Sequence, residues 1–175
     1  MWRLASLLLA ALFLAAPLSA GDDDIPIQRH LADLQLDDRL EQIQLIYRPL
    51  EEWSSHRHPK GGVVRYKAQR HQIKNPPREL DTMWLGLKRG RLVDIQLIYT
   101  AAHTRARSVD DLAAELALIY GEGRRQGNRF WWTDGKTVLR VFYAEVPKEE
   151  GVGLEWRTSI QVMNENLFSR SDATL

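Results

Sequence analysis

The chain has 175 residues, with 24 Lys and Arg against 23 Asp and Glu, and it contains no cysteine. That length suits one domain with a sizeable core. The balanced charge excludes the overall basic footprint that nucleic acids or anionic lipids attract. The missing cysteine excludes disulfides, thiolate catalysis and cysteine metal ligands. Because the charge is balanced, we expect no nucleic-acid partner.

The N-terminus has the layout of a secretory signal peptide. Arg3 supplies the positive charge, Leu4–Ala16 the apolar run, and Pro17–Ala20 the small-residue exit. An apolar run of this length is too short for a stable membrane span. We predict cleavage near Ala20 and export to the periplasm or the medium, with no membrane span in the mature chain. An uncleaved anchor is the alternative, because Leu18 stands where alanine is usual.

The first part of the mature chain predicts a helix, a loop and a strand. The helix is expected to begin at Asp37 or Asp38, where a carboxylate caps free backbone N–H groups. Apolar residues that recur at helical spacing form its buried face: Leu36, Leu40, Ile43 and Tyr47. After a predicted loop over Leu50–Gly62, alternating residues predict a half-buried strand over Val64–Gln69.

Two hairpins and a closing strand are predicted further along. Met83–Tyr99 folds back around a glycine, and Phe130–Tyr143 folds back around Asp134-Gly135. Apolar and polar residues alternate in the arm over Leu92–Tyr99, so we expect one core face and one solvated face. Trp156–Val162 alternates in the same way and predicts the last strand.

A second helix, over Ser108–Tyr120, lies between the two hairpins and has the clearest start signal. Ser108 and Asp111 stand three residues apart, as in a capping box. The expected buried stripe of this helix consists of Leu112, Leu116, Ile119 and Tyr120. The segment Thr100–Arg107 before it is expected to be a polar connection.

The two predicted helices match each other. Asp37-Asp38 precedes Leu45-Ile46-Tyr47 by the spacing that separates Asp110-Asp111 from Leu118-Ile119-Tyr120. About three predicted strands follow each helix, which suggests a duplicated α-β-β-β unit. The alternative is chance, because capping favours acidic residues at a helix start and burial favours apolar residues after it.

These elements predict an α+β fold in which an antiparallel sheet carries two packing helices. After the signal peptide, residues 1–20, a single domain would occupy residues 21–175. Its pseudo-repeat halves would cover approximately residues 30–100 and 104–168. Each half would consist of a helix laid on antiparallel strands.

A family resemblance covers Val109–Val141 and extends more loosely over Leu36–Tyr99. A helix ends Leu-x-x-Ile-Tyr-Gly-Glu-Gly over Leu116–Gly123, and Phe-Trp-Trp-Thr-Asp-Gly-Lys-Thr-Val-Leu follows over Phe130–Leu139. This pattern resembles the repeats of exported bacterial modules with a helix on an antiparallel sheet. The β-lactamase-inhibitor-protein-like modules and the small lipoproteins of outer-membrane assembly are examples. The chain lacks the lipoprotein cysteine. The resemblance implies protein binding through the sheet face and transfers no site residue.

No catalytic constellation is visible in the sequence. His56 and His58 are the only clustered histidines, and alternate residues of an extended loop can converge on a metal with a third ligand such as His71. Arg57 would place a cation between those ligands, so we expect an exposed loop instead. No G-x-S-x-G elbow occurs, and no spacing pairs two carboxylates for glycoside chemistry. We therefore expect no catalytic, cofactor or metal residues and no enzyme.

The aromatic run over Phe130–Trp132 points to a surface instead. Adjacent strand residues face opposite sides, so only one of Trp131 and Trp132 can enter the core. The outer one is either covered by the N-terminal segment or the other half, or it anchors a protein partner. Polar residues gather on the predicted outer strand faces: Arg65, Lys67, Asp94, Gln96, Arg140, Arg157 and Gln161. The candidate binding surface consists of Arg65, Lys67, Trp131, Trp132, Arg140 and Arg157.

These patterns favour an exported, non-catalytic binding or assembly module that binds a protein through its sheet face. Two alternatives stay open at this point. One is a hydrolase or metal-dependent enzyme with an unrecognised site, and the other is an envelope structural protein that self-associates through a sheet edge.

Overall fold

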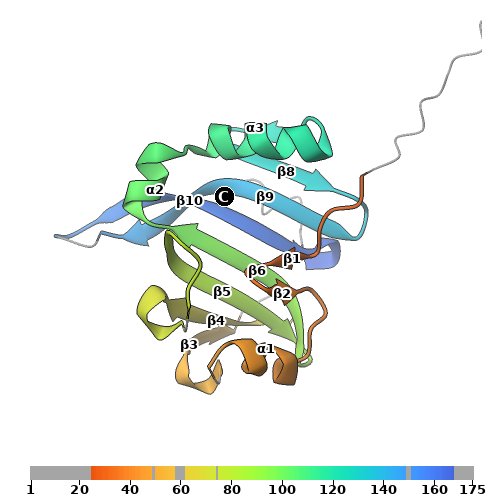
Figure 1. Ribbon diagram of the computed structural model, residues 1–175, viewed down its shortest axis with the longest axis vertical. Coiled ribbons are helices and arrows are strands. Elements are labelled where there is room, and N and C mark those ends of the chain that lie inside the picture. The colour runs from red at the N-terminus through yellow and green to blue at the C-terminus, as the bar shows by residue number, and fades with distance from the viewer. Residues whose placement is uncertain (1–24, 49, 58–61, 74, 149–150, 168–175) are drawn as a thin grey trace, which may run out of the picture.

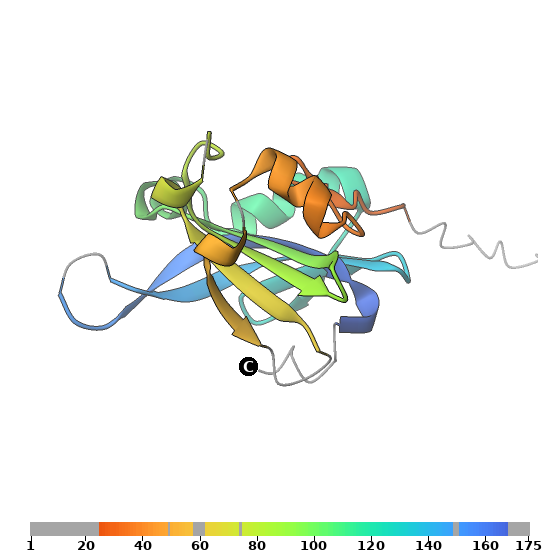
Figure 2. The same cartoon turned by 90° about the horizontal axis from the view of Figure 1, so that it is seen from below.

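The computed structural model describes residues 25–48, 50–57, 62–73, 75–148 and 151–167. Helices lie on one face of a large antiparallel sheet (Figures 1 and 2). The sheet has eight strands in the order β3-β4-β5-β6-β10-β9-β8-β7, and a separate hairpin, β1–β2, lies on the helix side. The predicted α+β fold, with helices on an antiparallel sheet, is confirmed. Across the described ranges, no helix has the length and apolar character that crossing a bilayer requires.

The elements fall into two halves that meet at the middle of the sheet. The first half contains β1 (His30–Leu31), β2 (Leu34–Gln35), α1 (Leu40–Ile46), β3 (Ser54–Arg57), β4 (Val64–Gln69), β5 (Leu80–Lys88) and β6 (Arg91–Tyr99). The second half contains α2 (Ala101–Ala106), α3 (Val109–Tyr120), β7 (Arg124–Gln126), β8 (Arg129–Thr133), β9 (Thr137–Pro147) and β10 (Leu154–Asn164). The 3-10 turns are η1 (Leu50–Glu52), η2 (Arg70–Gln72) and η3 (Glu165–Leu167). In both halves the first strand of the large sheet lies at an edge, and each later strand lies one place nearer the middle. There β6 pairs antiparallel with β10.

Each half has four strands after its helix, one more than the α-β-β-β pattern predicts. The additional strands are β3 and β7, which form the two edges of the sheet. Their sequences, Ser-Ser-His-Arg and Arg-Arg-Gln, are polar throughout, so no apolar alternation marks them as strands. The duplication itself stays a prediction.

Both helices bury the faces that their spacing predicts, with two differences. The Ser108 hydroxyl accepts a bond of 3.1 Å from the Asp111 N–H, and α3 begins directly after it. Ile119 is 56% exposed and does not belong to the buried stripe of α3. Helix α1 begins at Leu40, later than predicted, because Asp37 has a φ of +77° and donates its N–H to Leu92 in β6 at 2.7 Å.

The hairpins form as predicted, because their turns suit the twist of the strands. Arg89 and Gly90 have φ of +53° and +73°, the type I′ geometry that joins β5 to β6 through two residues. In the β8–β9 turn, the Asp134 carboxylate accepts backbone N–H bonds from Ile27 and Thr137. Burial alone would raise the pKa of Asp134, but these bonds hold it below its ordinary value.

The core consists of two apolar clusters on the helix side of the sheet. One lies under α1 around Ile43, and the other lies under α3 around Val109 and Trp132. The N-terminal segment joins them, since Ile27 belongs to the second cluster and Leu34 to the first. Figure 1 shows this segment crossing the sheet between the two helices. The sheet and this N-terminal segment therefore connect the two halves.

The segment before α3, predicted as a polar connection, contains the short helix α2. Thr100 caps this helix, and its His103 contacts Tyr99 and Glu79. The Thr100 hydroxyl accepts the His103 N–H at 3.3 Å. The buried His103 ring stacks on Tyr99, with ring centroids 4.2 Å apart, and its Nδ1 lies 2.5 Å from Glu79 Oε2. The His103 hydrogen bond is the main cause that lowers the pKa of Glu79 below 4.5.

The burial of α3 makes a direct prediction about stability. Leu112 is 8% exposed, so Leu112→Ala should lower the free energy of unfolding by about 2–5 kcal/mol through lost transfer energy and a residual cavity. Leu118, on the same helix, is 88% exposed, and Leu118→Ala should change it by less than about 0.5 kcal/mol. Urea unfolding of both variants measures the difference. Equal effects would contradict the observed orientation of α3.

The Glu79–His103 interaction makes a prediction about how stability depends on pH. Because the pKa of Glu79 is lowered in the folded protein, the interaction stabilises the fold above the ordinary carboxyl pKa of 4.5. That stability is lost as the pH falls through the lowered value. Glu79→Gln should therefore be less stable than the natural protein near about pH 7, and the gap should close toward about pH 3. Urea unfolding of both proteins as a function of pH measures this difference in stability. A difference independent of pH would contradict the Glu79–His103 interaction.

Candidate functional site

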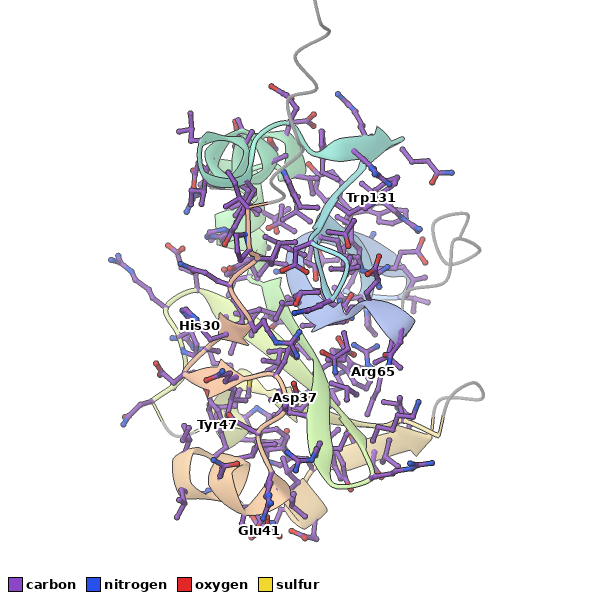
Figure 3. All side chains as sticks on the ribbon, turned by 90° about the vertical axis from the view of Figure 1, so that its right-hand side faces the viewer. His30, Asp37, Glu41, Tyr47, Arg65 and Trp131 are labelled. Atoms are coloured by element: carbon purple, nitrogen blue, oxygen red, sulfur yellow. The ribbon has the colours of Figure 1, made fainter. Side chains whose placement is uncertain are left out.

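The sheet face opposite the helices, which we call the open face, carries most of the predicted surface residues. Strand register places eight side chains in one row across the whole sheet. From β7 to β3 the row reads Arg124, Trp131, Arg140, Gln161, Gln96, Trp84, Lys67 and Ser54. Figure 3 shows Arg65 and Trp131 on this side of the sheet and Tyr47 on the other.

A hydrogen-bonded network lies at the centre of the open face. Asp94 in β6 is its hub. Its Oδ2 lies 2.9 Å from Arg65 Nε in β4, and its Oδ1 accepts a bond from Gln161 Nε2 in β10. Arg140 Nε in β9 donates to Gln161 Oε1 at 2.7 Å, which extends the chain of bonds to a fourth strand. The network therefore links both halves across the β6–β10 pair.

A branch of the same network also crosses the pair. Arg65 NH2 donates to Gln96 Oε1 at 2.7 Å, and Gln96 Nε2 donates to Ser159 Oγ at 3.0 Å. The Ser159 hydroxyl then donates to the Leu97 carbonyl at 2.9 Å. Gln96 and Ser159 thus each have hydrogen-bond partners, which is what burial of polar groups demands, whereas Arg65 Nε contacts Asp94 as an ion pair and not as a hydrogen bond.

The centre of this face is buried, although the alternation of β6 predicts a solvated face. Asp94 is 5% exposed and Gln161 is 2% exposed. Two arginines of the network also lie over aromatic rings: the Arg65 guanidinium lies 5.1 Å from the Trp84 ring centroid, and that of Arg140 lies 4.7 Å from the Phe142 ring centroid. Gly86, opposite Asp94, leaves room for the Asp94 side chain, since a Cβ at position 86 would meet Asp94 Cβ at 2.8 Å.

Four of the six predicted surface residues reach the open face with part of their side chains exposed: Arg65, Lys67, Trp131 and Arg140. Arg157 lies on the same face but is buried, with NH2 2.5 Å from Glu155 Oε1. The inclusion of Trp132 in the predicted surface was wrong, because its side chain is buried in the core. It packs under α3 on the opposite face, where its Nε1 donates to the Gly121 carbonyl at 2.8 Å. Trp131 is therefore the outer tryptophan.

Sequence reasoning missed Trp84, the central aromatic of the open face. Lys67 Nζ lies 5.7 Å from its ring centroid, and the His56 ring lies 5.6 Å from it. Trp84 stands between Lys67 and Gln96 in the cross-strand row. Its position in a hairpin arm with apolar residues on both sides gives no sign of which face it takes, and only the strand register assigns it.

A pocket of about 390 Å³ lies at one end of the open face. It is lined from the first half by residues of β4, η2, β5 and β6, and from the second half by the end of β9 and by Arg157 in β10. We call it the seam pocket, because both halves contribute its walls.

The histidine pair that was weighed as a metal ligand set, and expected to lie in an exposed loop, is only partly covered by the structure. His56 is exposed in β3, and His71 lines the seam pocket. His58 lies outside the described residues. Within the part of the chain that the structure describes, no group of three His, Cys, Asp or Glu side chains is arranged to hold a metal ion.

Comparison of the chain with known proteins finds no matching family model, no matching curated protein and no matching solved structure. The resemblance over Val109–Val141 to exported helix-on-sheet modules therefore stays a prediction.

The network makes a testable prediction about stability. Asp94→Asn removes the charge that Arg65 pairs with, and it should lower the free energy of unfolding by about 2–3 kcal/mol, since Arg65 is itself partly exposed. The matched control is Asp110→Asn, which removes the exposed Asp110–Arg125 pair at 3.3 Å and should cost less than about 1 kcal/mol. Chemical unfolding compares the two variants. Similar small losses would show that the network contributes little.

Proposed function

We propose that this chain is a non-catalytic binding module that engages a protein partner through the open face. The observation that carries the proposal is the arrangement of partly exposed Arg65, Arg140 and Trp131 around a buried, hydrogen-bonded network. Arginine and tryptophan contribute strongly to protein interfaces. Side chains already held by hydrogen bonds and ring contacts lose little conformational entropy on binding, which favours affinity.

The dimensions of the face support a protein partner. Strands lie about 4.8 Å apart, so eight strands span roughly 34 Å. A standard protein interface covers about 800 Å² on each partner, or roughly 28 Å on a side. The open face is therefore wide enough for one such interface. The buried Asp94 carboxylate also offsets the charge of Arg65, which makes the centre of the face less suited to a polyphosphate chain than to a protein surface.

We also propose that the protein acts after export, in the periplasm or the medium. This part of the proposal rests on the N-terminal sequence alone: Arg3, the apolar run Leu4–Ala16 and the small-residue exit Pro17–Ala20. A domain of this size needs no disulfides in an oxidising compartment, so the absence of cysteine is compatible with it.

Site-specific photo-cross-linking in the producing cells tests the proposed function. A photoreactive residue at position 131 should give a discrete protein adduct in the envelope or secreted fraction. The control is the same residue at position 118, which is well exposed on the helix side and should give none. Arg140→Ala should weaken the adduct at position 131 by roughly fivefold or more, as loss of an interface anchor implies.

Two outcomes would refute the proposal. One is the same adduct pattern from positions 131 and 118, which would mean that the open face is not distinguished from the helix side. The other is an adduct at position 131 that Arg140→Ala and the exposed control Lys136→Ala affect equally. Unfolding midpoints of both variants establish that they are folded.

A further inference from the structure

The seam pocket has two kinds of wall. Four cationic side chains line it, namely Lys67, Arg70, Lys148 and Arg157, against the two carboxylates of Asp81 and Glu145. Its volume of about 390 Å³ lies in the range of small-ligand sites. The lining therefore carries an excess of positive charge in a space large enough for a small organic group.

Several of these charges already have partners within the protein. Buried Arg157 pairs with Glu155 at 2.5 Å, and Arg70 NH1 donates to the Leu80 carbonyl at 3.0 Å. Asp81 Oδ2 accepts the Thr82 hydroxyl at 3.0 Å. These contacts fix the walls. Lys67, held against the Trp84 ring, and exposed Lys148 are the long cationic side chains best able to turn toward a ligand.

The remaining wall is apolar. Trp84 and Ile98 line the pocket from the sheet, and Val146 and Pro147 line it from the end of β9. An indole face accepts an aromatic or aliphatic group over its surface. Lysine ammonium groups beside this wall would attract the charged end of the same molecule.

We propose that the seam pocket binds an organic carboxylate whose apolar body rests against Trp84 and Ile98 and whose charged end faces Lys67 and Lys148. A single negative charge fits the small cationic excess. With Arg157 paired to Glu155, three cations face two carboxylates, and the second negative charge of a phosphate dianion would exceed that excess. The inference rests on the proposed function in one respect: the C-terminal carboxylate of a protein partner has this chemistry, and so does a free carboxylic acid.

Titration calorimetry at low salt, on protein purified from expression of the full chain, tests the inference. The probes are phenylacetate and its amide, a tripeptide ending in phenylalanine with a free or amidated C-terminus, and inorganic phosphate. Each carboxylate should bind about tenfold or more tightly than its amide, and phosphate should bind more weakly than either carboxylate. Tighter binding of the peptide would identify a protein chain end as the source, and tighter binding of phenylacetate a free acid.

Matched variants connect binding to the pocket. Lys67→Gln and Lys148→Gln should each raise the Kd for the carboxylates by about fivefold to tenfold, and the Kd should rise with salt. Lys136→Gln, at the exposed β8–β9 turn outside the pocket, should leave it unchanged. Because Arg157 is buried, the test relies on the two lysines, whose variants should keep the natural unfolding midpoint.

Equal affinities for carboxylates and amides would overturn the inference, as would equal losses from Lys67→Gln and Lys136→Gln. This failure can be told apart from failure of the proposed function, because Trp131 does not line the seam pocket. Carboxylate binding without an adduct at position 131 refutes only the protein-binding face. An adduct at position 131 without carboxylate binding refutes only the pocket.

Discussion

The pairing of β6 with β10 is the contact on which the rest of the structure depends. It joins the two halves at the middle of the sheet, with Gln96 opposite Gln161 and Asp94 opposite Met163. A shift of one residue in this register would turn every side chain of one strand to the other face. The apolar residues of β10, such as Val162, would then face away from the helices, and Asp94 would lose Gln161. Core and network therefore fix the same register.

The two faces of the sheet satisfy burial in different ways. On the helix side, apolar clusters under α1 and α3 remove hydrocarbon from water, which is the dominant favourable term in folding. On the open face, no helix of the described residues covers the polar centre. There, the Arg65–Asp94 ion pair and the hydrogen bonds that Gln96 and Gln161 make offset the cost of taking these groups out of water. The polar side chains at the centre of this face are therefore bonded to one another and are not solvated separately.

The matching helix ends also differ in what burial explains. Tyr47 is buried, and Tyr120 packs against the second cluster, so the core accounts for the tyrosine at both positions. Leu45 and Leu118 are 87% and 88% exposed, and the core accounts for neither. The alternative of chance, in which burial selects the matching residues, therefore does not cover the two leucines. The tripeptides are identical at all three positions, of which the leucine and the isoleucine are exposed and the tyrosine contacts the core.

The sequence by itself determined the elements whose signals are local. The Ser108–Asp111 capping box starts α3, Asp134-Gly135 turns the β8–β9 hairpin, and alternation marks β4 within its observed bounds. Such signals act between residues a few positions apart, so they survive without knowledge of the fold. The same reasoning placed Arg65, Lys67 and Arg140 on the outer faces of their strands, but it left open which of Trp131 and Trp132 faces outward. Polar edge strands β3 and β7 and the short helix α2 carry no such local pattern and went unseen.

Only the tertiary structure decided what those outward residues surround. Asp94 and Gln161 are separated by 67 positions, and their contact exists only because β6 and β10 pair. The burial of this polar centre, the place of Trp84 in the cross-strand row and the seam pocket all depend on the order of strands in the sheet. Periodicity states which side of a strand a residue takes, but it does not state which neighbours share that side. That information lies in the register between distant strands.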